Sequence, residues 1–200
     1  MEKEDIQNKL LKIGRSIIQE KGAEGLTARK LSEASGCSVG AIYNQFSNME
    51  NFVVIQNYMT LEALAEALDK NKETENPYAD LNALVQSFVS FVKNNKNLWY
   101  LLYSFHLRQN DRTYSTFYLR KVAKIAGKLN SCLQRAVPEV AGPERLLSGQ
   151  ILWLSLFAVS SFLTKDALAD LSRADENTIC QILTNTYVAG LTVLADKAKS

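Results

Sequence analysis

Apolar side chains recur at helical spacing along most of this chain. Near the N-terminus Ile6, Leu10, Ile13 and Ile17 follow one another at intervals of four, three and four residues, which places them on one face of a helix. No segment has the sustained alternation of apolar and polar positions that is typical of a strand with one buried face. The pattern therefore predicts an all-α chain of about nine helices.

Two short helices are predicted after the first one. Gly22 and Gly25 end the first helix, and the next two are expected at about 27–35 and 38–46, on either side of Gly36. Glycine suits such a break, because it takes the left-handed backbone conformation in which helices commonly stop.

A longer connecting helix is expected over about 47–70. Its first residues, Ser47-Asn48-Met49-Glu50, match a capping box, in which a serine oxygen accepts an early backbone N–H and a glutamate reaches back. The polar stretch 71–76 then ends the helical pattern. We therefore expect one domain at residues 1–50 and a second at 71–200, with the connecting helix between them.

Beyond the polar stretch the apolar spacing predicts five more helices. Three are amphipathic and cover about 81–92, 98–105 and 117–133, and the last two are expected at about 143–164 and 175–197. The 19 residues from Leu146 to Thr164 carry no charge and are long enough to cross a bilayer, but seven of them are small or polar. A buried helix, in a bundle or at a dimer interface, is therefore favoured over a membrane span.

The composition fits a globular chain with no evident charged partner. Of the 200 residues 46% are hydrophobic and 22% charged, and 23 Lys and Arg against 21 Asp and Glu give a net charge of +2. Near-neutrality points neither to nucleic acid nor to a membrane surface. The N-terminus is charged where a signal peptide would be apolar, so we expect a cytoplasmic protein.

Residues that bind metals or act in catalysis are sparse. Cys37, Cys132 and Cys180 are far apart and form no C-x-x-C pair, and His106 is the single histidine. The sequence has no phosphate-binding glycine loop and no G-x-S-x-G elbow. We therefore expect reduced thiols, no metal, no cofactor and no enzymatic activity.

Residues 26–46 have the pattern of a helix-turn-helix, in which two short helices pack together and the second enters a major groove. Thr27 and Ser38 are placed to cap the two helices. The apolar positions expected to pack the pair together and against the first helix are Leu26, Leu31, Val39, Ile42 and Phe46. From spacing alone, a three-helix substructure without a nucleic-acid role is an equal alternative.

The same stretch resembles the DNA-binding region of TetR-family transcriptional regulators. That region has a Thr-initiated helix, a turn of small residues, a short helix ending in Tyr-x-x-Phe, and a capped long helix. In this chain the pattern is Thr27, Ala34-Ser35-Gly36, Tyr43-Asn44-Gln45-Phe46 and Ser47-Asn48-Met49-Glu50. The resemblance covers residues 6–55, and the rest of the chain matches in being all-α and of suitable length.

The resemblance implies that Thr27 and Tyr43 hold phosphates and that Arg29 touches a base or a phosphate. The other residues expected at or near the DNA are Ser38, Val39, Gly40, Ala41, Asn44 and Gln45. Asparagine and glutamine pair with adenine, arginine pairs with guanine, and small residues let the helix approach the groove closely. For Tyr43, packing as a surface aromatic is the alternative.

Met49 departs from the family pattern, which commonly has a lysine at this position. Residues 1–50 also contain seven basic and seven acidic side chains, so the predicted DNA-binding region is formally neutral. Binding is therefore expected to depend on a few placed contacts rather than on general attraction to phosphates.

Seven of the 18 aromatic residues fall between Trp99 and Tyr118. Aromatic walls with a few polar tips suit a pocket for a small apolar or aromatic molecule, and the family binds ligands in this region. The residues expected to line it are Trp99, Tyr103, His106, Tyr114, Phe117 and Tyr118. Core packing is the alternative for each of them, and the identity of the effector is open.

The resemblance implies a ligand-responsive regulator, a repressor that binds a palindromic operator in double-stranded DNA as a homodimer. The helices at about 143–164 and 175–197 would form the dimer interface, and a small-molecule effector would release the DNA. The alternative is a protein of the same fold that binds DNA in the nucleoid or during cell division, or a protein–protein adaptor without operator repression.

Overall fold

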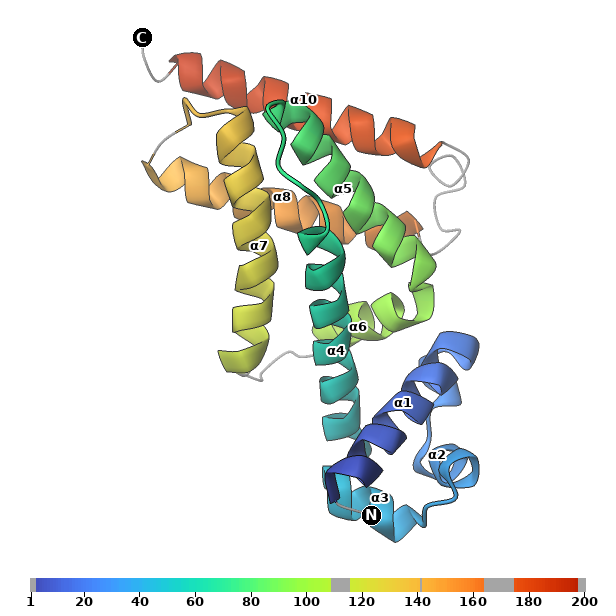
Figure 1. The fold of residues 1–200 in the computed structure, drawn as a ribbon. Coiled ribbons are helices and arrows are strands. Elements are labelled where there is room, and N and C mark those ends of the chain that lie inside the picture. The colour runs from blue at the N-terminus through green and yellow to red at the C-terminus, as the bar shows by residue number, and fades with distance from the viewer. Residues whose placement is uncertain (1–2, 109–115, 141, 164–174, 198–200) are drawn as a thin grey trace. The chain divides into compact units, whose positions relative to one another are not determined.

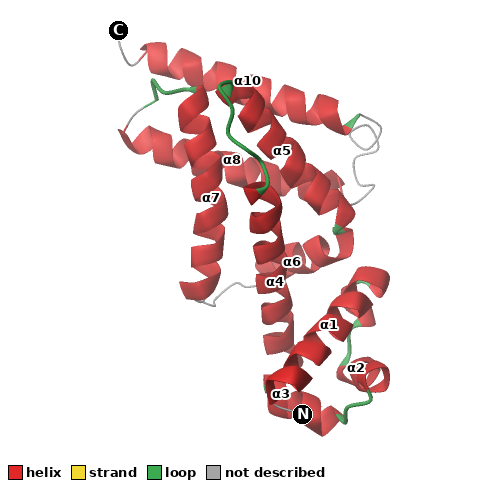
Figure 2. Cartoon of the chain, viewed as in Figure 1, coloured by secondary structure: helices red, strands yellow, loops and turns green. Residues whose placement is uncertain are grey.

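The computed structural model describes residues 3–108, 116–140, 142–163 and 175–197, apart from the side chains of a few of them. Within these residues the chain forms nine α-helices and one 3-10 helix and contains no strand (Figure 2). The helices are α1 (Lys3–Lys21), η1 (Ala23–Gly25), α2 (Ala28–Ser35), α3 (Val39–Phe46), α4 (Met49–Asp69), α5 (Pro77–Asn94), α6 (Lys96–Arg108), α7 (Thr116–Ala136), α8 (Gly142–Leu163) and α10 (Glu176–Lys197). The all-α prediction is confirmed.

The helices group into two compact units (Figure 1). The first comprises Met1–Leu61 and Asn95–Thr113, and the second comprises Glu62–Asn94 and Tyr114–Ser200. The long helix α4 contributes its first half to one unit and its second half to the other. The division into a DNA-binding domain at 1–50 and a ligand-binding and dimerisation domain at 71–200 is a functional one and stays a prediction.

The start of α4 differs from the prediction. Ser47 does not cap this helix: it has a φ of 65°, and its backbone N–H closes α3 by donating to the carbonyl of Tyr43 at 2.7 Å. The cap is the next residue, Asn48, whose Oδ1 accepts the backbone N–H of Asn51 at 2.7 Å. The helix cap was therefore predicted one residue too early.

In the first unit an apolar core lies between α1, α2, α3 and α4. Leu10, Leu31, Ile42, Phe46 and Phe52 are its buried members, and the rings of Phe46 and Phe52 meet edge to face at 4.8 Å. Burying side chains of this size is the main source of stability in so small a unit.

Polar contacts also join α1 to α4. Gln56 donates from Nε2 to the carbonyl of Leu11 at 2.9 Å, and Arg15 donates from Nη1 to Thr60 Oγ1 at 3.2 Å. Burial lowers the pKa of Arg15. These contacts fix α1 along the first half of α4.

Helix α6 packs with the N-terminal helices. Ile18 of α1 forms a buried cluster with Leu98 and Leu101 of α6, and Asn97 donates from Nδ2 to the carbonyl of Gln19 at 2.8 Å. The sequence pattern gave no sign of this, because amphipathic spacing shows that a helix has an apolar face but not which helix covers it.

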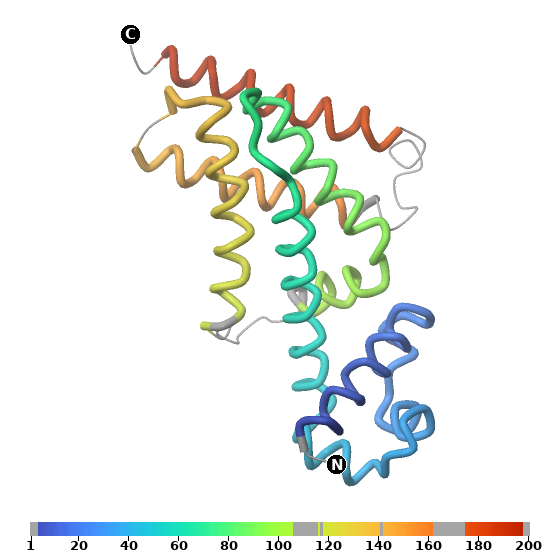
Figure 3. The backbone as a smooth tube through the Cα atoms, in the orientation of Figure 1, coloured from blue at the N-terminus to red at the C-terminus, as the bar shows by residue number. Residues whose placement is uncertain are grey.

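The second unit contains α5, α7, α8 and α10 (Figure 3). Phe88 of α5 and Trp153 of α8 are both buried and meet edge to face at 5.6 Å. On α7, Lys121 pairs with Glu62 of α4, and Lys124 and Lys128 reach Asp69 at 3.2 and 2.8 Å. These pairs join the second half of α4 to α7.

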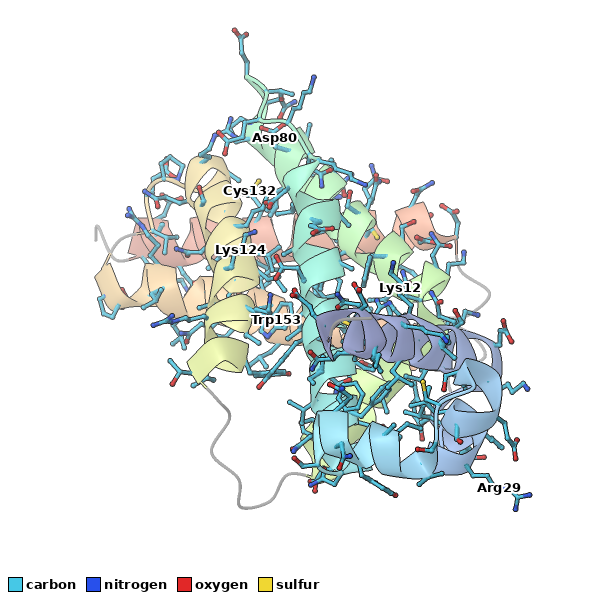
Figure 4. All side chains as sticks on the ribbon, turned by 60° about the horizontal axis from the view of Figure 1, so that its bottom comes forward. Lys12, Arg29, Asp80, Lys124, Cys132 and Trp153 are labelled. Atoms are coloured by element: carbon cyan, nitrogen blue, oxygen red, sulfur yellow. The ribbon has the colours of Figure 1, made fainter. Side chains whose placement is uncertain are left out.

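The connector between α4 and α5 is held by a buried carboxylate. Asp80 accepts from Thr74 twice, from the backbone N–H at 2.8 Å and from Oγ1 at 2.6 Å, and it also accepts from Arg135 of α7 at 2.9 Å (Figure 4). Arg135 in turn donates to the carbonyl of Thr74 at 2.5 Å. The two bonds from Thr74, and then the arginine, lower the pKa of Asp80.

We expect this carboxylate to make the second unit sensitive to acid. A carboxyl with a lowered pKa in the folded state stabilises the fold above its ordinary pKa near 4, and this contribution is lost as the pH falls through the folded-state pKa. Asp80→Asn should therefore lower the melting temperature at neutral pH and flatten its decline on acidification. Thermal unfolding followed by circular dichroism over a pH series measures both effects.

The matched control is Glu73→Gln, which removes an exposed carboxylate 3.4 Å from the same arginine but leaves the bonds from Thr74 intact. Its acid profile should follow that of the wild type. An Asp80→Asn profile that runs parallel to the wild type would show that this carboxylate does not link stability to pH.

Candidate nucleic-acid interface

The turn between α2 and α3 has the backbone that a helix-turn-helix needs. Gly36 ends α2 in the left-handed conformation, with φ 70° and ψ 9°, and a Cβ added to it would meet no atom within 4 Å. Glycine is therefore required by the backbone angle and not by lack of space. Ser32 donates to the carbonyl of Cys37 at 2.6 Å, and Ser35 accepts from its N–H at 3.2 Å, so the turn is pinned on both sides.

Both predicted helix caps are confirmed. Thr27 Oγ1 accepts the backbone N–H of Lys30 at 3.1 Å, at the start of α2. Ser38 Oγ accepts the backbone N–H of Ala41 at 3.1 Å, at the start of α3. Each hydroxyl satisfies one of the N–H groups that a helix leaves without a partner in its first turn, and both residues are exposed.

The two helices bury one side and expose the other. Leu31, Ile42 and Phe46 point into the core, as predicted. Val39 does not: its side chain is 38% exposed and lies outside the cluster, so the prediction that it packs the helices together was wrong. Because Val39 opens α3, its position is compatible with the DNA contact that was also predicted for it.

The predicted DNA-contacting residues lie mostly on the exposed side. Tyr43 is 43% exposed, which fits a phosphate contact better than a packed aromatic. Ala41 and Gln45 are half-buried, and the exposed members of the predicted set are Thr27, Arg29, Ser38, Val39, Gly40, Tyr43 and Asn44. Among the described residues, α2 and α3 thus expose mainly polar side chains, with Val39 and Gly40 at the start of α3.

Two charged contacts on this part of the chain were missed by the sequence reasoning. Arg29 donates from Nε to Glu33 Oε1 at 3.0 Å on the exposed side of α2, and Lys9 of α1 donates to the carbonyl of Ser35 at 2.8 Å, at the end of α2. The contact between Arg29 and Glu33 could have been predicted from the sequence, because residues four apart on a helix are neighbours. The second depends on tertiary packing, which spacing does not reveal.

Met49 is part of the apolar core. It is partly buried and packs against the cluster of the first unit, at the start of α4. The residue that replaces the common lysine thus adds apolar contact in place of a phosphate-binding cation.

The residues predicted to bind a ligand are distributed over both units. Trp99, which is fully buried, and Tyr103, which is half-buried, belong to α6 in the first unit, and the buried Tyr118 belongs to α7 in the second. Tyr114 lies outside the described residues, as do the side chains of His106 and Phe117. Burial alone does not separate a pocket wall from core, so the ligand site stays a proposal.

A groove with a cavity volume of about 630 Å³ lies between α8 and α10 in the second unit. Apolar side chains dominate its lining, among them Leu147 and Ile151 of α8 and Leu191 and Leu194 of α10. Tyr187 of α10 donates to the carbonyl of Ser148 of α8 at 2.5 Å and joins the two helices. Among the described helices, α10 has the length and the apolar composition of a membrane-spanning helix. A single helix of this kind is weak evidence for a membrane protein, because core helices of other proteins have the same length and composition.

The N-terminal sequence matches a known family. Residues 10–54 fit the family model described as bacterial regulatory proteins, tetR family, and this match spans α2, α3 and the turn between them. Among curated proteins, no sequence matches the chain significantly.

Several solved structures share the fold. A tetR-family transcriptional regulator from Streptomyces coelicolor aligns over 99% of this chain and 86% of its own, with a TM-score of 0.72 and 13% identity. The fatty acid degradation regulator FadR from Bacillus halodurans aligns over 92% and 98%, with a TM-score of 0.66 and 15% identity. RolR in complex with the ligand resorcinol aligns over 98% and 93%, with a TM-score of 0.66 and 14% identity.

At such low identities these structures establish the shared fold, and the family model establishes the kind of N-terminal domain. The capped helices and the left-handed glycine turn lie within the residues that match this family model. Residues 10–54 therefore match the tetR family of bacterial regulatory proteins, and the matched region contains the helix-turn-helix formed by α2 and α3.

Proposed function

We propose that the chain is a ligand-responsive transcriptional repressor that binds a palindromic operator as a homodimer and leaves it when a small apolar or aromatic effector binds. The observation that carries the DNA-binding part is the exposed side of α2 and α3. It combines two capped helix starts, an arginine, a tyrosine and an asparagine over a buried apolar core. Rigid packing on the buried side of the two helices and hydrogen-bonding groups on their exposed side suit sequence readout in a major groove.

The dimer part rests on the apolar surface of α8 and α10. Seven of the twelve exposed large hydrophobic side chains in the described residues belong to these two helices. They are Leu146, Leu147, Ile151, Leu154, Ile182, Val193 and Leu194. An exposed apolar face of this kind favours an interface, and a second copy supplies a self-complementary partner.

A two-fold dimer would also let the protein contact two half-sites of the DNA at once. Two copies of α3 about 34–36 Å apart would read half-sites one helical turn apart. An effector that binds better to a conformation with another spacing shifts the population away from DNA. RolR, which has the same fold, binds resorcinol, and this supports a small aromatic compound as the class of effector. We place this activity in the cytoplasm.

The test is selection of bound sequences from a random pool of duplexes, first without and then with a panel of small aromatic and aliphatic compounds. We expect an enriched palindrome whose binding is lost with at least one compound. Equal affinity of the purified protein for the enriched duplex and for random duplexes would overturn the proposed function.

Arg29→Ala should weaken binding to the enriched duplex by about 1 to 3 kcal/mol if the guanidinium contacts a base. If Arg29 contacts only a phosphate, the loss should be smaller and equal for all sequences. Binding curves on enriched and random duplexes at several salt concentrations separate the two. Arg120→Ala, which removes an exposed arginine of α7, is the control and should leave both affinities close to those of the wild type.

A further inference from the structure

Several basic side chains of the first unit are already engaged within the protein. Lys9 donates to the carbonyl of Ser35, the half-buried Arg15 donates to Thr60, and Arg29 donates to Glu33. Three of the seven basic residues in positions 1–50 thus have an intramolecular partner. The bonds of Lys9 and Arg15 to neutral acceptors leave their charges in place, whereas the bond from Arg29 to Glu33 pairs two opposite charges. Because residues 1–50 are formally neutral, the position of each carboxylate near the DNA-binding face is important.

Glu33 is the carboxylate on α2 itself. It lies four residues after Arg29 and three after Lys30, so it is one turn away from both cations of this helix. The side chains of Arg29 and Glu33 are 88% and 62% exposed. Figure 4 shows Arg29 at the outer edge of α2, pointing away from the other helices of the first unit.

The ion pair between Arg29 and Glu33 is weak, but the charge of the Glu33 carboxylate acts over a longer distance. An exposed ion pair four residues apart changes an equilibrium by only about twofold, so DNA readily displaces Glu33 from Arg29. The carboxylate itself stays in place after the pair opens. Its field extends about 10 Å at moderate salt and opposes any phosphate that approaches this end of α2.

We propose that Glu33 sets the sequence discrimination of the protein by opposing the phosphate contacts that Arg29 and Lys30 would make on any duplex. The inference rests on the proposed operator binding. On the operator, the contact of Arg29 with a base replaces its bond to Glu33. On other sequences no base contact replaces this bond, and repulsion between the carboxylate and the phosphates remains. The ratio of operator affinity to random-duplex affinity thus rises, because complexes with other sequences are weakened.

Glu33→Gln tests the role of the charge. The amide keeps the size of the side chain and an acceptor for Arg29 but removes the negative charge. Binding is measured for a duplex of random sequence and for the duplex enriched from the random pool, each over a salt series. At low salt the affinity for the random duplex should rise about 3- to 10-fold. The slope of log K against log salt should steepen by about 1, and the ratio of enriched to random affinity should fall.

Glu20→Gln is the matched control, because it removes the same charge from an exposed position of α1. Its random-duplex affinity and salt slope should stay close to those of the wild type. Equal effects of the two variants would assign the change to net charge and overturn the inference. A Glu33→Gln variant whose enriched and random affinities rise by the same factor would overturn it as well. A wild type that fails to distinguish the duplexes would instead contradict the proposed operator binding.

Discussion

Leu194→Glu is expected to convert the protein to a monomer and to weaken operator binding by about 100-fold or more. Leu194 lines the groove between α8 and α10, and its side chain is 62% exposed in the single chain. A charge at an exposed position costs the fold of one chain little. In a two-fold interface the same change places two carboxylates in an apolar surface, where ions without partners are strongly unfavourable.

The loss of DNA affinity follows from the loss of the dimer. Two linked half-site contacts bind more tightly than either alone by a factor of about 10² to 10⁴, because the second contact is intramolecular. A monomer retains only one contact. Glu139 and Glu144 also line the groove, so a new carboxylate at position 194 meets like charge and not a compensating cation.

Leu119→Glu is the matched control, since Leu119 is a 50% exposed leucine on α7 that does not line the groove between α8 and α10. It should stay dimeric in sedimentation at micromolar concentration and keep the DNA affinity of the wild type. Circular dichroism should show the same helix content for both variants. A dimeric Leu194→Glu variant with full operator affinity would exclude this face as the interface.

Local signals in the sequence predicted the geometry of the helix-turn-helix. Thr27 and Ser38 cap their helices and Gly36 takes the left-handed conformation, because each role depends on one residue type and its immediate neighbours. The failure at Ser47 has the same origin. Serine and asparagine both cap helices, and the positive φ of Ser47, set by the turn after α3, gives the role to Asn48.

Contacts between distant segments were not predictable in this way. The cluster of Ile18 with Leu98 and Leu101 joins segments about eighty residues apart, and the sequence suggested instead that residues 98–105 belong with the C-terminal helices. The exposure of Val39 was missed for a related reason. An apolar residue in the first turn of a short helix fits either a core or a surface, and only the packing of α3 on α1 and α4 decides between them.

The packing of α1 on α4 depends on a glycine whose role the sequence also concealed. A Cβ added to Gly14 would lie 2.3 Å from Cζ of Phe52, a ring with no exposed surface. The ring is held by its edge-to-face contact with Phe46 and by the rest of the cluster, so it has little room to move aside. Gly14 is thus required because the aromatic ring occupies the place of a side chain.

Phe52→Ala is expected to destabilise the first unit by about 3 to 5 kcal/mol, the usual cost of emptying a fully buried aromatic site. Gly14→Ala should destabilise it by about 1 to 3 kcal/mol through overpacking, although glycine to alanine inside a helix ordinarily stabilises by up to about 1 kcal/mol. The double variant should cost less than the sum of the two, because the added methyl group occupies space that the ring has vacated. Protection of the α1 and α4 amides against hydrogen exchange measures all three.

Gly127→Ala supplies the reference for an unobstructed helix glycine, since a Cβ at this exposed position of α7 meets no atom within 4 Å. It should leave the first unit unchanged and stabilise α7 slightly. Strictly additive losses in the double variant would show that the cost of Gly14→Ala does not come from the ring of Phe52. A stabilising Gly14→Ala would show that the ring moves aside at no cost. In that case the hydrogen bonds of Gln56 and Arg15 would have to fix most of the position of α1 on α4. Helices α2 and α3 pack on these two helices, so their position would depend on the same bonds.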